Sequence, residues 1–76
     1  MSESDRPLDA LNQSRNKRVV VELKNNKIYI GKLKAFDIHI NTVLDEAEEH
    51  ENGELKRKVG TLFIRGDTIV LISAEK

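Results

Sequence analysis

The fold of this chain is organised around residues 35–44, which read AFDIHINTVL. Asp37, His39 and Asn41 stand two positions apart between apolar neighbours, so in an extended chain their side chains would point to one side. A second polar interruption, the RGD sequence at residues 65–67, separates two apolar runs later in the chain. We expect these two turns to meet in space and to hold one flat polar ligand, a nucleic-acid base.

The size of the chain limits what can hold it together. With 76 residues it forms one domain with a small core, and such chains bury only about 60% of their unfolded surface. The absence of Cys excludes disulfides and thiolate metal sites, and two His are too few for a structural zinc site. We therefore expect no metal and no cofactor, which leaves self-association as the remaining support for so small a fold.

The ends and the charge of the chain indicate its setting. Residues 1–5 are polar and are expected to form a disordered tail before a domain at residues 6–74. The charged start lacks the apolar run of a signal peptide, and no run approaches the length of a membrane span. We expect a cytoplasmic protein without a membrane partner. The net charge of zero argues against a general polyanion binder.

The charges are nevertheless sorted along the chain. Residues 15–34 contain seven basic side chains and one acidic side chain, whereas residues 45–54 contain six acidic side chains and neither Lys nor Arg. Such sorting gives the molecule a basic side and an acidic side. The basic residues between Lys17 and Lys34 are either a second contact surface for nucleic acid or an ordinary solvated face.

Local signals predict one helix followed by five strands. A short helix is expected over residues 7–14, with Pro7 at its first position, where the missing N–H costs nothing. Asp5 or Arg6 would cap it. Runs rich in Val, Ile and Leu, separated by turn residues, predict the strands. Their expected bounds are 18–23, 28–36, 42–49, 55–64 and 68–73, with a hairpin tip at 50–54.

The second strand contains a glycine that decides how the sheet is shaped. Gly31 inside a strand indicates a bend or a close approach of another backbone. A strongly bent long strand closes a small barrel. The predicted fold class is therefore all-β with one N-terminal helix, as a strongly bent five-stranded antiparallel barrel that stays partly open.

The last two strands are more apolar than one small domain requires. Residues 62–64 (LFI) and 69–72 (IVLI) are consecutive apolar runs, whereas a half-exposed strand needs apolar side chains only at alternate positions. Either the helix or another copy of the chain covers the extra face. Strand pairing between copies would also remove the aggregation hazard of an apolar edge, and it gives a ring if the joining rotation closes.

Two long patterns in the chain resemble the two motifs of Sm and Sm-like (LSm) proteins, most closely those of archaea. The first is VxVxLK at residues 19–24 with YxGxLxxFDxHxNxVL at residues 29–44, and the second is GxxxIRGDxIVxI at residues 60–72. The resemblance runs from about Pro7 to Ser73, and many positions at fixed spacing make it specific. It implies a helix capping a bent five-stranded barrel. It also implies rings, usually of seven subunits, in which the fourth strand of one copy pairs with the fifth strand of the next.

The resemblance further implies a ligand and the residues that bind it. Family members bind single-stranded, uridine-rich RNA around the central pore of the ring. By position, His39 and Arg65 would stack on the two faces of a uracil, and Asn41 would hydrogen-bond its Watson–Crick edge. Gly66 and Asp67 would add backbone contacts.

The chemistry of these side chains suits a base. An imidazole and a guanidinium are planar and stack on the π-face of a base, with stacking worth about 1–3 kcal/mol per base. The amide of Asn41 presents a donor beside an acceptor. One orientation of the amide matches uracil and the flipped orientation matches cytosine, so the neighbouring backbone must fix the choice. Asp37 is expected to support this turn, and a ring of identical sites would add avidity.

Two other functions compete with RNA binding. Asp37, His39 and Asp67 could mimic an acid–base set, but the four serines lie near the termini or the helix end, so no nucleophile is placed beside His39. We therefore expect neither catalysis nor a small-molecule substrate. The remaining alternative is a structural ring-forming module for protein–protein interaction without direct RNA binding. Such a module shares the fold but does not need His39, Asn41 and Arg65 together.

Overall fold

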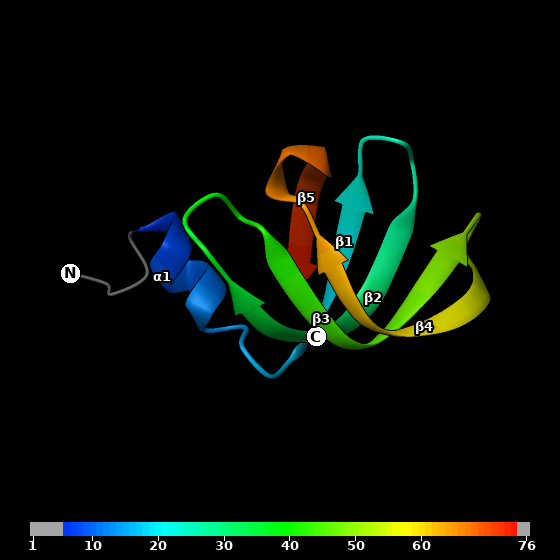
Figure 1. Cartoon of the computed structure of the whole chain (residues 1–76), viewed down its shortest axis with the longest axis horizontal. Helices are drawn as coiled ribbons and strands as arrows, with labels where there is room; N and C mark the ends of the chain where they lie inside the picture. The colour runs from blue at the N-terminus through cyan, green and yellow to red at the C-terminus, as the bar shows by residue number, and fades with distance from the viewer. Residues whose placement is uncertain (1–5, 75–76) are drawn as a thin grey trace.

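The computed structural model describes residues 6–74 and contains a single antiparallel sheet with strand order β4-β3-β2-β1-β5 (Figure 1). The predicted tail at residues 1–5 lies outside the described residues. The predicted fold class, one N-terminal helix and a bent five-stranded antiparallel sheet, is confirmed. The elements are α1 (Pro7–Asn12), β1 (Arg18–Leu23), β2 (Ile28–Phe36), β3 (Thr42–Glu51), β4 (Glu54–Ile64), the 3-10 turn η2 (Gly66–Thr68) and β5 (Ile69–Ala74).

The sheet bends where the backbones of β2 and β3 lie especially close together. A Cβ atom at Gly31 would lie 3.0 Å from the Cα atom of Ala47 and 3.0 Å from the carbonyl oxygen of Asp45. The predicted close approach at Gly31 is therefore confirmed. The pairing of β2 with β3 shifts register at this point, and positive φ angles at Glu46 (51°) and Gly60 (76°) accompany a further register shift between β3 and β4. Such irregularities bend and twist a strand.

The core lies inside this bend and follows the alternation of the strands. Val19 and Val21 of β1 are fully buried, as their spacing of two predicts. Leu11 of α1 packs against the core from outside the sheet, so the helix contributes to the core at one end. The buried hydrophobic residues are Val19, Val21, Tyr29, Leu33, Leu44, Ala47 and Ile64.

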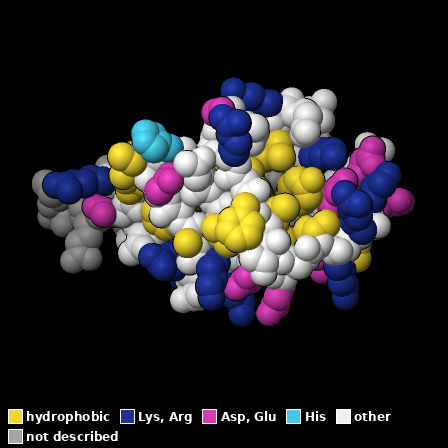
Figure 2. Space-filling view, viewed as in Figure 1, with side chains coloured by type: hydrophobic (Ala, Val, Ile, Leu, Met, Phe, Trp, Pro, Cys, Tyr) yellow, Lys and Arg dark blue, Asp and Glu magenta, His cyan; other side chains and the backbone are white. Residues whose placement is uncertain are grey.

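The apolar surplus of the last two strands remains uncovered in the single chain. Phe63 on β4 is 77% exposed, and Val70 and Leu71 on β5 are 56% and 45% exposed. Figure 1 shows α1 beyond the ends of β2 and β3, away from β4, and Figure 2 shows hydrophobic side chains open to solvent over β4. The helix therefore does not cover Phe63, and Val70 and Leu71 also stay exposed in the single chain.

The helix begins at Pro7 after Arg6, as predicted, but differs from the prediction in its end and in its capping hydrogen bond. The helix ends at Asn12 instead of Ser14 because residues 13–16 form a turn, and Asn16 at its end has a φ of 66°. Arg6 occupies the N-cap position but makes no side-chain cap hydrogen bond. Asp5, the other expected cap, lies outside the described residues.

The bounds of the last three strands also differ from prediction. The third strand continues to Glu51 and the fourth begins at Glu54, because the hairpin tip needs only Asn52 and Gly53, whose φ angles of 55° and 80° give a two-residue turn. The fifth strand occupies Ile69–Ala74 instead of 68–73, because the preceding turn extends through Thr68 as η2.

The β3–β4 hairpin extends past the barrel, and ion pairs join its two paired strands. The Arg57 side chain donates to the carboxylate of Glu49 at 2.9 Å, and the Lys56 ammonium lies 2.8 Å from the carboxylate of Glu51. The predicted opposition of basic and acidic arms is confirmed. Figure 1 shows this hairpin projecting away from α1. Within residues 6–74, no helix is long and apolar enough to cross a membrane.

Candidate nucleic-acid interface

The turn between β2 and β3 is organised by the carboxylate of Asp37. Its Oδ1 accepts hydrogen bonds from the backbone N–H groups of His39 (2.8 Å) and Asn41 (3.1 Å), and its Oδ2 accepts one from Asn41 Nδ2 (3.0 Å). The Ile40 N–H donates to the Asp37 carbonyl, and a φ of 62° at Ile40 turns the chain. One carboxylate thus determines the direction in which His39 and Asn41 project.

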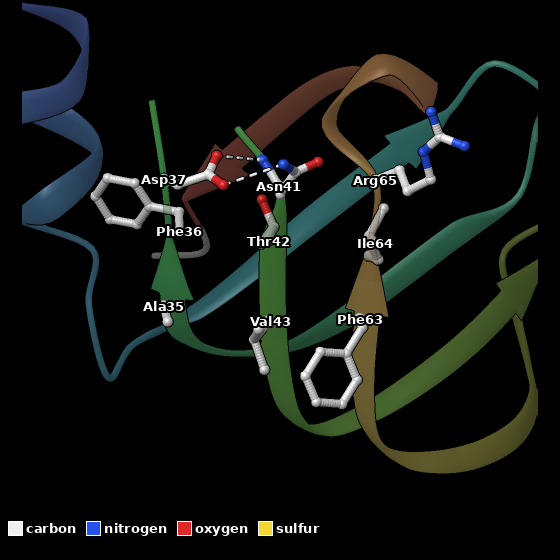
Figure 3. Close-up of a pocket in the computed structure, with 9 residues that line it drawn as sticks. All are labelled: Ala35, Phe36, Asp37, Asn41, Thr42, Val43, Phe63, Ile64 and Arg65. Atoms are coloured by element: carbon white, nitrogen blue, oxygen red, sulfur yellow. Dashed lines mark hydrogen bonds between the residues drawn. The ribbon is translucent and has the colours of Figure 1, made fainter. Parts of the chain in front are cut away.

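The turn expected at residues 37–41 is confirmed. Asp37, His39 and Asn41 lie in a tight turn, and the side chain of Asp37 points at Asn41, not at solvent beside it (Figure 3). A short polar side chain that accepts from backbone N–H groups two and four residues ahead competes with extended structure. The supporting role expected of Asp37 requires such hydrogen bonds to the turn.

The second turn follows β4 directly and is closed by Thr68. The Thr68 N–H and hydroxyl donate to the Arg65 carbonyl at 3.1 and 2.6 Å. The Arg65 guanidinium donates to the Asp67 carboxylate at 2.9 Å. Thr42 follows the first turn, and Ile64 precedes the second. These two residues pair across β3 and β4, which brings the two turns side by side.

The two turns are in direct contact through Gly66. Its N–H donates to Asn41 Oδ1 at 2.7 Å. A Cβ atom at position 66 would overlap the His39 carbonyl oxygen and would lie 2.8 Å from the carbonyl carbon of Ile40. Only glycine lets the backbones approach so closely. The prediction that the two turns meet is confirmed.

The contact fixes the orientation of the Asn41 amide. Its Oδ1 faces the Gly66 N–H, and its Nδ2 faces the Asp37 carboxylate. The flipped amide would place a donor against a donor and an acceptor against a carboxylate. In the observed orientation Oδ1 retains a second acceptor site and Nδ2 a second hydrogen.

All five predicted contact residues line one shallow, open pocket. They are His39, Asn41, Arg65, Gly66 and Asp67. His39 and Arg65 are exposed, so their planar groups are accessible. The hydrogen bond from the Asn41 side chain, with those from the backbone of His39 and Asn41, holds the pKa of Asp37 below its ordinary 3.8. The Asp37 carboxylate is therefore charged at neutral pH, as its three acceptor roles require.

Two neighbours of this pocket were missed by the sequence reasoning. A second, apolar pocket adjoins Asn41 and Arg65, and Val43 and Phe63 line it (Figure 3). The apolar surplus of residues 62–64 was its only signal in the sequence. The backbone N–H of Lys24, in the β1–β2 turn, donates to the Thr68 carbonyl at 2.8 Å. Nothing local in the sequence indicates that contact.

Comparison with known proteins assigns the chain to a family. The family model of the LSM domain matches residues 9–74. The chain belongs to the LSM domain family. This Sm-like chain is 53% identical over 68 residues to an snRNP Sm-like protein of Archaeoglobus fulgidus, covering 90% of this chain and 88% of that protein. The resemblance stated from the two motifs is confirmed.

Two solved structures show the same fold at substantial sequence identity. The Pyrococcus abyssii Sm protein, solved in complex with a uridine heptamer, has a TM-score of 0.89 and 41% identity, covering 93% of the Sm-like chain and 100% of that chain. A heptameric archaeal Sm protein has a TM-score of 0.83 and 36% identity, covering 88% of the Sm-like chain and 97% of its own.

Proposed function

We propose that this Sm-like chain forms a homo-oligomeric ring, most simply a heptamer, that binds single-stranded, uridine-rich RNA at its central pore. The ring acts without catalysis, as a scaffold or chaperone in cytoplasmic RNA metabolism. The observation that carries the proposal is the fixed amide of Asn41 between Gly66 and Asp37. The uridine heptamer bound by the Pyrococcus abyssii relative and the heptameric state of the second relative support it.

The fixed amide favours uracil over cytosine. The remaining acceptor site of Asn41 Oδ1 receives the uracil N3–H, and the remaining hydrogen of Nδ2 is donated to O4. Cytosine has an acceptor at N3, which would face the acceptor Oδ1, and a donor at C4, which would face the donor Nδ2. Flipping the amide would break its bonds to Gly66 and Asp37, each worth about 0.5–1.5 kcal/mol or more.

Stacking adds affinity but does not distinguish one base from another. The imidazole of His39 and the guanidinium of Arg65 lie at the mouth of the pocket and are exposed. Stacking on such groups contributes about 1–3 kcal/mol per base. One pocket alone is weak, so binding of a strand depends on several copies that act together.

The edges of the sheet provide the means of assembly. The outer strands are β4 and β5, which carry the exposed Phe63, Val70 and Leu71. Unpaired backbone groups on an edge strand pair readily with another chain. Pairing β4 of one copy with β5 of the next uses two different edges, so it repeats from copy to copy and gives a ring when the rotation between neighbours closes.

The proposal is tested with short oligouridine and oligocytidine strands of equal length. Fluorescence anisotropy at moderate salt measures both affinities, and light scattering measures the native mass. We expect a mass several times that of the chain and a clear preference for oligouridine. A ring that binds neither strand, or both equally, would contradict the RNA function and favour the structural-module alternative. A monomer would contradict the assembly.

A further inference from the structure

The turn between β1 and β2, residues 24–27, lies against the turn that carries Arg65 and Gly66. The Lys24 N–H donates to the Thr68 carbonyl at 2.8 Å, and the preceding residue pairs with Ile69. Consecutive Cα atoms are about 3.8 Å apart, so the Cα atoms of Gly66 and Thr68 are no more than roughly 7.6 Å apart. Lys24 is therefore a neighbour of the base pocket.

The β1–β2 turn has a fixed shape. The Leu23 N–H donates to the Lys27 carbonyl at 2.9 Å, and the Asn26 N–H donates to the Leu23 carbonyl at 3.0 Å. The Lys27 N–H donates to Asn25 Oδ1 at 3.0 Å, and Asn26 has a φ of 70°. The stem of Lys24 thus rises from a backbone that is tied both to its own turn and to η2.

The charge of Lys24 is not neutralised within the described part of the chain. Other cations face carboxylates: Lys34 lies 3.6 Å from Asp45, and Lys56 lies 2.8 Å from Glu51. None of the ion pairs formed within residues 6–74 involves Lys24, which is exposed. Figure 2 shows Lys and Arg side chains gathered over η2 and the β1–β2 turn.

The residues of the base pocket offer little positive charge for the phosphates of an RNA strand. Asp67 at its edge carries a carboxylate that is 63% exposed and repels a phosphate. Its partner Arg65 is assigned to the face of the base. A base in the pocket brings a phosphodiester within one ribose of it, so a cation beside the pocket would be placed to contact that phosphodiester. A Lys ammonium is a compact point charge of the kind that contacts phosphate.

We propose that the ammonium of Lys24 binds the RNA phosphodiester next to the base held by His39, Asn41 and Arg65. This proposal rests on the proposed function and assigns the backbone interaction that the base pocket lacks. Phosphate contacts add affinity and fix register but carry no sequence information. Lys24 therefore acts on affinity and salt dependence and not on the preference for uracil.

The test compares Lys24→Gln with Lys17→Gln in the full chain. Both variants remove one exposed charge that no ion pair within residues 6–74 engages, and β1 separates the two positions by six residues, about 20 Å. Oligouridine affinity is measured against salt concentration. We expect Lys24→Gln to weaken binding severalfold at low salt and to reduce the salt slope by about 0.7 for each phosphate that is no longer neutralised.

Three further results are expected of the same series. Lys17→Gln keeps the wild-type slope, and Lys24→Arg restores it. Lys24→Gln keeps the wild-type ratio of oligouridine to oligocytidine affinity and binds the nucleoside uridine, which has no phosphate, as the wild type does. Light scattering shows the same mass for all variants.

The outcomes separate this proposal from the function on which it rests. If the wild type prefers oligouridine and Lys24→Gln keeps the wild-type salt slope, Lys24 does not bind phosphate and the proposed function stands. A changed base preference or weaker uridine binding in Lys24→Gln would also overturn the proposal, because Lys24 would then act on the base pocket. A wild type that prefers neither strand would overturn the proposed function itself.

Discussion

The side-chain amide of Asn41 joins the two turns of the pocket, accepting from the Gly66 N–H at 2.7 Å and donating to the Asp37 carboxylate at 3.0 Å. The same amide is therefore a structural link and, in the proposed function, the group that reads the base. Its remaining hydrogen-bonding capacity points away from these two partners. Substitutions at this link separate the two roles.

Asn41→Ala should abolish the preference for oligouridine over oligocytidine. It removes the amide at the proposed base edge and leaves the Gly66 N–H without its acceptor, at a cost of about 1 kcal/mol in the free energy of unfolding. Assembly should persist because Asn41 lies on neither edge strand. Strand titrations, denaturant unfolding and light scattering measure these effects, with Asn12→Ala at the exposed end of α1 as control. Dissociation of the ring in Asn41→Ala would show that Asn41 is required for assembly.

Gly66→Ala should push the two turns apart. The added Cβ atom overlaps the His39 carbonyl, and such overpacking costs about 1–3 kcal/mol of stability. Oligouridine affinity should fall with it. Gly53→Ala is the matched control, because Gly53 has a φ of 80° and open space around its Cα atom. That control should lose about 1–2 kcal/mol from left-handed backbone strain and bind oligouridine as the wild type does. Unchanged binding by Gly66→Ala would mean that the close contact is not needed.

Asp37 should make the stability of the protein depend on pH in the acid range. Hydrogen bonds, first from the Asn41 side chain, lower the folded-state pKa of Asp37 below its ordinary 3.8, so protonation favours the unfolded chain. The stabilisation is complete above pH 3.8 and is lost as the pH falls through the lowered folded-state value. Asp37→Asn should remove this part of the acid dependence and weaken oligouridine binding at neutral pH.

The measurement for Asp37 is the difference in unfolding free energy between wild type and Asp37→Asn across that pH range. Taking the difference removes the contribution of the other carboxylates that titrate in this range, because both proteins contain them. A difference that does not change with pH would contradict the hydrogen-bonding role of Asp37.

Phe63→Glu should reduce the native mass. Phe63 is 77% exposed on the edge strand β4, and a charge there opposes burial against another copy. Leu55→Glu is the control, because Leu55 is also an exposed apolar side chain of β4 (49%) but lies beside the hairpin tip. Light scattering should give a smaller mass for Phe63→Glu alone, and its oligouridine affinity should fall because avidity is lost. An unchanged mass would place the interface elsewhere.

The sequence predicts the parts of this fold that depend on local signals. The bounds of β1 and β2 agree with prediction to the residue, because Val19 and Val21 alternate cleanly and an Asn-rich turn follows. Gly31 indicated the close approach of β3, since a glycine inside a strand has few other reasons to be there. The five contact residues that the family resemblance implies also line one pocket.

Other features depend on contacts between distant segments, and the sequence does not contain them in readable form. Ile40 adopts a φ of 62°, which β-branched residues rarely do, because the hydrogen bonds of Asp37 and the contact with Gly66 hold the turn. The orientation of the Asn41 amide depends on a bond across 25 positions. The proximity of Lys24 depends on the pairing of β1 with β5, for which residue spacing alone gives no register.

The β3–β4 hairpin offers a practical use. Its arms are paired along the backbone and joined by the Glu49–Arg57 and Glu51–Lys56 ion pairs, so they should stay together when residues are inserted between Asn52 and Gly53. This tip projects from the barrel, away from α1 (Figure 1). A peptide epitope or a fluorophore site inserted there leaves the core untouched. Each copy in an assembly would then display one insert, which makes the protein a scaffold for multivalent presentation.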